Sequence, residues 1–125
     1  MMRQLFVIGN KDVVYSSVRH VFDNGQEAIP CGIPDPEIFP GPEVMLETPF
    51  IYISGVVVKR QRFNQRRFDS RLDSIEDWDM WMRMSTEGDS FIHNPEKLLT
   101  YTVKSTGMAP KRTEEKVQLL KSKYI

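Results

Sequence analysis

The sequence predicts a single α/β domain in which a mixed β-sheet is flanked by helices. Residues 50–58 give the strongest strand pattern, because they are nearly continuous in β-branched and aromatic side chains. Residues 74–84 have the spacing of an amphipathic helix, and residues 113–124 repeat that spacing near the C-terminus. A chain of 125 residues is long enough for one core, so residues 1–125 are treated as one domain.

Composition excludes several classes of function. Lys and Arg total 17 and Asp and Glu total 17, so the formal net charge is zero, and neither nucleic acid nor an anionic membrane is expected as a partner. Cys31 is the single cysteine, which excludes an internal disulfide and fits a reducing compartment. No apolar run is long enough for a transmembrane segment or a signal peptide. We therefore expect a cytoplasmic protein, at most peripheral to the membrane.

The first part of the chain predicts a strand and then a long loop. Residues 12–22 are rich in β-formers and end at Asp23-Asn24-Gly25, a hairpin turn signal that leads into a second strand. His20 lies on the first of these strands, where we expect a surface or hydrogen-bonded side chain. Residues 30–49 contain six of the eight prolines, so they predict a loop, with a short helical turn at residues 43–47.

The middle of the chain predicts a central strand and then a basic segment. Residues 50–58 are expected at the centre of the sheet, and Gly55 marks a bulge or a close approach of another group. Residues 59–71 carry six cations and one acid. Three interpretations are open for this basic segment: a solvated helix and turn, a local anion site, or an RNA-binding surface.

The last part predicts two strands and a helix. Short strands are expected at residues 91–93 and 97–104, separated by a turn at Asn94-Pro95. The C-terminal helix of residues 113–124 has an apolar stripe of Val117, Leu120 and Tyr124. Its lysines 116, 121 and 123 are expected to face water.

Asp77 is the unusual residue of the helix at 74–84. On a helix that begins at Ser74, Asp77 falls on the apolar side, where an ionised carboxylate is costly without a partner. One interpretation makes Ser74 the N-cap and Asp77 the acid of a capping box. The other lets Asp77 project into a partly dry cleft walled by Trp78 and Trp81, where it could accept a proton. Both tryptophans also have ordinary core spacing.

Residues 68–101 resemble the C-terminal, acceptor-side half of family-2 glycosyltransferases of the GT-A fold. The family pattern is roughly Gly-Gly-Phe-Asp-Glu, a spacer, Glu-Asp-Trp-Asp-Leu-Trp-Leu-Arg-Leu, then Gly, Pro, Leu and Tyr-Arg. Residues 76–84, Glu-Asp-Trp-Asp-Met-Trp-Met-Arg-Met, match it position by position, and Gly88, Pro95, Leu98 and Tyr101 follow in order. The resemblance implies a partial GT-A sheet with flanking helices that lacks most of the nucleotide-binding half.

The resemblance also implies a function and its residues. Asp77 matches the catalytic base of inverting members, which deprotonates the acceptor hydroxyl as it attacks the sugar. Glu76, Trp78 and Trp81 are implied as acceptor-binding residues. A nucleotide-sugar is the implied donor, and a saccharide or a lipid-linked molecule is the implied acceptor. Arg83 is expected to pair with Asp79 four residues before it, as a structural contact.

Departures from the family pattern limit what this chain is expected to do by itself. No Asp-x-Asp-like motif precedes Asp12, so no metal ligand is assigned, and Mg²⁺ or Mn²⁺ is implied only for a complete enzyme. Arg66 and Arg67 replace the usual glycine pair, and Lys104 replaces a late histidine, so these three cations are the candidate phosphate or anion site. The alternative function is a non-catalytic binding or assembly module that forms a homo-oligomer through its sheet edge and uncovered apolar surface.

Overall fold

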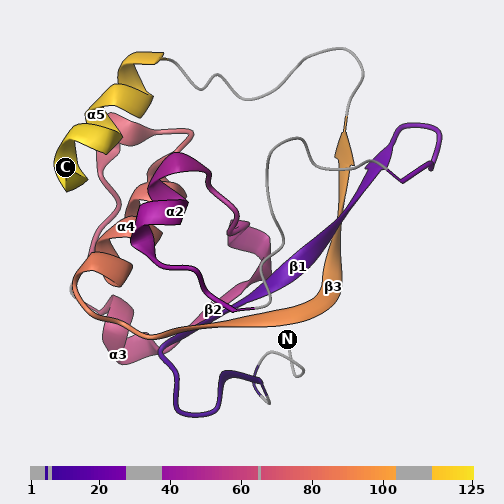
Figure 1. Ribbon diagram of the computed structural model, residues 1–125, viewed down its shortest axis with the longest axis horizontal. Helices are drawn as coiled ribbons and strands as arrows, with labels where there is room; N and C mark the ends of the chain where they lie inside the picture. The colour runs from indigo at the N-terminus through magenta and orange to yellow at the C-terminus, as the bar shows by residue number, and fades with distance from the viewer. Residues whose placement is uncertain (1–4, 6, 28–37, 65, 104–113) are drawn as a thin grey trace.

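The computed structural model describes residues 5, 7–27, 38–64, 66–103 and 114–125. Its elements follow one another along the chain in a mixed order of strands and helices (Figure 1). They are β1 (Val13–Phe22), α2 (Pro42–Glu47), the 3-10 turn η1 (Ile53–Gly55), β2 (Val56–Val58), α3 (Arg60–Phe63), the 3-10 turn η2 (Ser70–Leu72), α4 (Glu76–Thr86), β3 (Phe91–Val103) and α5 (Glu114–Tyr124).

The described strands form one mixed sheet in the order β2-β1-β3. Strand β1 pairs antiparallel with β2 and parallel with β3, with Val13 opposite both Val58 and Phe91. Helices α2, α4 and α5 gather together beside this sheet (Figure 1). The predicted α/β class, with a mixed sheet and flanking helices, is therefore confirmed.

The prediction that residues 50–58 form the central strand is wrong for the part of the sheet that is described. Only Val56–Val58 is a strand, and it lies at the edge, whereas β1 is central. Phe50 and Ile51 are buried in the core without joining the sheet. Their apolar character reflects core packing, and the turn η1 breaks the run where Gly55 packs tightly against β1.

Strand β3 is continuous where two short strands were expected. The register against β1 shifts around Ser16 and Ser17, so extra residues of β3 bulge out beside them. The Asn94 side chain accepts a hydrogen bond from the Glu96 amide at 3.1 Å, which is the turn that Asn94-Pro95 predicted. The turn lies within the bulge, and β3 continues to pair with β1 after it. The turn signal in the sequence therefore does not end the strand.

Several local predictions are confirmed. The turn after β1 closes with a hydrogen bond from the Gly25 amide to the Phe22 carbonyl. Of the second strand expected after this turn, the described residues contain only an isolated bridge between Glu27 and Val21. A short helix, α2, occupies the end of the proline-rich segment, while residues 28–37 of that loop lie outside the described part. Residue Thr113, where the C-terminal helix was expected to begin, and Lys104 also lie outside it.

The core lies between the sheet and the helices. Its buried apolar residues come from β1, α2, the segment before η1, α4, β3 and α5. Leu120 of α5 is completely buried, and Val117 and Tyr124 pack against the same core, which confirms the predicted stripe. The Trp78 indole donates to the Met45 carbonyl at 2.8 Å and so joins α4 to α2. None of the helices in the described ranges is long and apolar enough to cross a membrane.

Candidate functional site

The start of α4 differs from the predicted capping arrangement. The helix begins at Glu76, and its N-cap is Ile75, which makes no side-chain cap hydrogen bond. Ser74 lies outside the helix in the left-handed region, at φ 80°, so the predicted Ser74 cap is wrong. Ile75 and Leu72 are both buried, and burying them fixes the point at which the helix begins. Packing has here replaced a polar cap.

The acids in the first turn of α4 have different environments. Asp79 is completely buried, whereas Asp77 and Glu76 are only partly buried. One Glu76 carboxylate oxygen, Oε2, is shielded from solvent and makes no hydrogen bond to the residues that the structure describes. Asp77 therefore keeps some access to solvent, as a proton acceptor for an incoming hydroxyl requires.

Asp79 is a structural carboxylate. It accepts hydrogen bonds from Arg83 at 2.8 Å and from the Tyr124 hydroxyl at 2.6 Å, and it pairs with Lys123 at 2.8 Å. The Arg83 contact confirms the expected pair four residues apart. Lys123 contacts this buried acid, so the prediction that it faces water is wrong; only tertiary packing brings α5 against α4.

This buried cluster alters the titration of its members. Burial, the hydrogen bond to Asp79 and its negative charge raise the pKa of the Tyr124 hydroxyl. Burial alone would lower the pKa of Arg83, but the hydrogen bond and charge of Asp79 outweigh it and raise that pKa. Arg83 therefore stays charged and Tyr124 stays neutral at physiological pH, which suits a permanent structural contact.

Trp78 and Trp81 are core residues in this structure. Their exposed fractions are 4 % and 3 %, so their ring faces pack against the protein interior. The alternative that the spacing left open, core packing, therefore describes both side chains. Their role in binding an acceptor stays a prediction.

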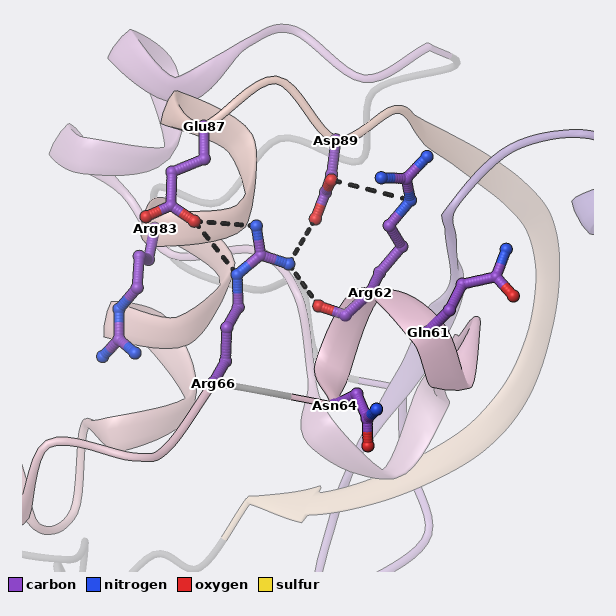
Figure 2. Close-up of a pocket in the computed structure, with 7 residues that line it drawn as sticks. All are labelled: Gln61, Arg62, Asn64, Arg66, Arg83, Glu87 and Asp89. Atoms are coloured by element: carbon purple, nitrogen blue, oxygen red, sulfur yellow. Dashed lines mark hydrogen bonds and ion pairs between the residues drawn. The ribbon is translucent and has the colours of Figure 1, made fainter.

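A polar cleft of about 490 Å³ lies at the other end of α4 (Figure 2). Its lining residues come from α3, the segment after it and the end of α4 with the following loop. They are Gln61, Arg62, Asn64, Arg66, Arg83, Glu87 and Asp89. Cations and acids alternate around this cleft, so its charge is close to balanced.

Arg66 lies in the middle of the cleft (Figure 2) and donates to protein acceptors on several sides. Its guanidinium donates to Glu87 at 2.7 and 3.0 Å, to Asp89 at 2.6 Å, and to the Arg62 carbonyl. Burial alone would lower the pKa of Arg66, but hydrogen bonds to Glu87 and Asp89 raise it. An anion at this site would have to compete with these carboxylates for the guanidinium.

Arg62, which lines this cleft, belongs to a hydrogen-bond network that joins the residue before β1 to the residue before β3. Asp12 accepts from Arg62 at 2.9 Å and from the amide and hydroxyl of Ser90 at 2.8 and 3.0 Å. Burial tends to raise the pKa of Asp12, but the hydrogen bonds from Ser90 and Arg62 outweigh it and lower the pKa. The basic segment therefore fastens secondary-structure elements to one another.

Of the predicted anion residues, Arg66 lies at the far end of α4 from Asp77, and Lys104 lies outside the described residues. Arg67 donates to backbone carbonyls of the same segment, at Asn64 and Arg66. From Asp77 to Glu87 there are ten residue steps, which is about 15 Å along a helix at its usual rise. Asp77 and the Arg66 cleft thus lie at opposite ends of α4, although the sequence places the basic segment directly before it.

Two features were not anticipated from the sequence. The Ser17 hydroxyl and His93 Nε2 are 2.8 Å apart in the interior, and a second, smaller pocket has Ser16 in its lining. The signal for both was the pair of serines between Tyr15 and Val18 of β1, which indicates small polar groups facing buried neighbours. Their partners on β3 and η1 are distant in sequence, so the pairing could not be read from it.

The described residues show no metal centre, and the sequence comparisons show no relative from which a function for either end of α4 could be taken. The described residues contain no group of three or more His, Cys, Asp or Glu side chains that could hold a metal ion. Comparison of the sequence with protein-family models and with curated proteins gives no match.

Proposed function

We propose that this chain provides the acceptor side and the catalytic base of an inverting, sugar-nucleotide-dependent glycosyltransferase of the family-2 type. The observation that carries the proposal is Asp77, which matches the base position of the family pattern and is partly exposed at the start of α4. Its neighbour Asp79, in the same first turn, is completely buried and held by Arg83, Lys123 and Tyr124. These two environments support different roles for the two acids.

The proposed reaction is a single displacement. An acceptor hydroxyl oxygen attacks the anomeric carbon of the donor sugar, and the Asp77 carboxylate takes the hydroxyl proton as the new bond forms. The bond between the anomeric carbon and the diphosphate oxygen breaks, and the nucleoside diphosphate leaves with the electron pair. Because attack and departure occur on opposite faces, the configuration inverts.

The chain's own residues supply only part of this chemistry. In a complete enzyme a divalent cation, Mg²⁺ or Mn²⁺, would neutralise the diphosphate, and no residue of this chain is assigned to it. Glu76 lies directly before Asp77 and is proposed to orient the acceptor. Arg66, Arg67 and Lys104 remain the candidate anion residues, although Arg66 is already held by Glu87 and Asp89.

The Asp77→Asn substitution tests the proposal. Removing the base is expected to reduce sugar transfer by about 10²- to 10⁴-fold, while circular dichroism and thermal unfolding stay close to the wild type. The matched control is Asp73→Asn, which changes an acid whose side chain is 76 % exposed and which lies just before the helix. Near-normal transfer by Asp77→Asn in the full-length protein would refute the assignment of the base.

The second candidate is a non-catalytic assembly module. The observation that favours it is the outer position of β3, a strand of 13 residues that pairs on only one side within the described sheet. A long unpaired edge is a template for pairing with another chain. This candidate predicts self-association without sugar transfer, which light scattering measures.

A further inference from the structure

A narrow pocket of about 100 Å³ lies between β1, β3 and the segment containing η1. It is lined by Ser16, Ser54, Gly55, Val56, Val57, Leu98 and Leu99. Pockets for whole small ligands are usually about 300 to 1,000 Å³. A pocket of this size therefore suits one substituent of a ligand.

The Ser16 hydroxyl is an unpaired polar group in this pocket. Ser16 is 3 % exposed, and its hydroxyl makes no hydrogen bond with any residue that the structure describes. Buried hydroxyls normally have a partner, because leaving one without a hydrogen bond costs free energy. Apart from Ser54 and Gly55 the remaining lining is aliphatic, so an occupant should present a polar group toward the serines and an apolar group toward the leucines and Val57.

Gly55 keeps this pocket open. A Cβ added at Gly55 would lie 2.7 Å from the Ser16 hydroxyl oxygen and 3.0 Å from a Leu99 methyl carbon. Both distances are shorter than side chains normally allow, so any larger residue would fill the space above Ser16. The absence of a side chain at Gly55 thus leaves room beside the Ser16 hydroxyl, which is shielded from solvent.

An aromatic cluster lies next to the pocket on the same face of β1. Ser16 and His20 are four residues apart, so their side chains point to the same side of the strand. The His20 Nε2 atom lies 2.9 Å from the Tyr52 hydroxyl, and the Tyr52 and Tyr101 ring centres are 5.8 Å apart. Tyr101 follows Leu99 by two residues and is 47 % exposed. An exposed aromatic ring beside a small pocket is a suitable surface for a flat, partly apolar ring.

We infer that the pocket binds the acetamido group of an N-acetylated sugar. The acetamido methyl group would pack against Leu98, Leu99 and Val57, and its amide N–H or C=O would hydrogen-bond with Ser16. The sugar ring would lie toward Tyr101. The choice of a sugar rests on the proposed function, whereas the choice of the acetamido group rests on the size and lining of the pocket. The group could belong to the donor or to the acceptor, which share this chemistry.

Binding to the isolated chain tests the inference by methyl and amide NMR spectra. Titration with N-acetylglucosamine is expected to shift the methyl signals of Leu98, Leu99 and Val57, which lies on the Ser16 face of the sheet. The affinity for glucosamine and for glucose is expected to be at least roughly tenfold lower, because neither has an acetyl group to fill the pocket. Comparison of methyl N-acetylglucosaminide with a nucleoside-diphosphate N-acetylglucosamine then separates the sources, since tighter binding of the nucleotide identifies the donor.

Two substitutions separate binding from stability. Ser16→Ala is expected to weaken N-acetylglucosamine binding about fivefold while leaving the free energy of unfolding equal or higher, because it removes an unpaired buried hydroxyl. Gly55→Ala should abolish the methyl shifts by filling the pocket. Ser122→Ala, on the exposed side of α5, is the control and should change neither property.

The outcomes distinguish this inference from the proposed function. Equal binding of glucose and N-acetylglucosamine, unchanged binding by Ser16→Ala, or no methyl shifts at millimolar sugar would each overturn the pocket assignment. Those results would leave the effect of Asp77→Asn on transfer untouched. Conversely, full transfer activity of Asp77→Asn would refute the base while the acetamido preference of the pocket remained measurable.

Discussion

At the scale of single residues, two aspartates in the same turn of α4 differ in burial and in the partners that surround them. Asp79 is completely buried, and two cations and a tyrosine hydroxyl hold it. Asp77 is partly exposed two positions earlier. A buried carboxylate is stable only when its charge and lone pairs are satisfied. The local sequence contains both acids, but α5 determines which one becomes structural.

The Asp79→Ala substitution should be strongly destabilising. It would leave Arg83 and Lys123 partly buried without their shared carboxylate, and removing one member of such a buried set costs about 3 to 5 kcal/mol. Urea unfolding followed by tryptophan fluorescence measures the change. Asp77→Ala is the matched control on the same helix and should cost less than about 1 kcal/mol, since partly exposed positions are tolerant. Equal losses in the two variants would contradict the structural role of Asp79.

At the scale of elements, α5 is attached to the remainder of the chain by charged contacts in addition to its buried apolar stripe. Lys123 pairs with Asp69 at 3.0 Å, and Arg71 donates to the same carboxylate at 2.9 Å. The Arg71 and Lys123 hydrogen bonds lower the pKa of Asp69 well below its ordinary value. Asp69 precedes η2, so this contact joins the turn before α4 to the C-terminal helix.

This contact makes the attachment of α5 dependent on pH. The pKa of Asp69 is lower in the folded chain than its ordinary value of 3.8, so its contribution is complete above that value and is lost as the pH falls below it. Between pH 7 and pH 3, the wild type should therefore lose more unfolding free energy than Asp69→Asn. Urea unfolding at both pH values measures this difference, and Asp23→Asn in the exposed turn after β1 is the control. Parallel losses in wild type and Asp69→Asn would contradict the assignment.

At the scale of the whole molecule, the described sheet has two outer strands of very different length. Strand β2 has three residues, whereas β3 has 13. Proteins usually cover or interrupt long edges, because these edges pair with other chains. The bulge beside Ser16 and Ser17 disturbs the side of β3 that faces β1. The outer side of β3 is therefore the surface through which self-association is expected.

Light scattering across a concentration series tests this expectation. The chain should change from monomer to dimer as its concentration rises, because β3 can pair with the same strand of a second copy. Thr100→Lys places a charge on the exposed part of β3 and should shift the change to higher concentration. A monomer at every concentration would remove the support for the assembly function and for the expected homo-oligomer.

The sequence by itself determined the α/β class, the helix that became α4, the pair formed by Asp79 and Arg83, and the apolar stripe of α5. These features depend on neighbours within a few residues, so periodicity and spacing reveal them. Only the tertiary structure decided that β1 is central, that Lys123 reaches Asp79, and that Ser16 faces Gly55 in a pocket. The physical reason is that these contacts join segments tens of residues apart. Their free energy comes from burial and charge satisfaction between elements, which no local pattern encodes.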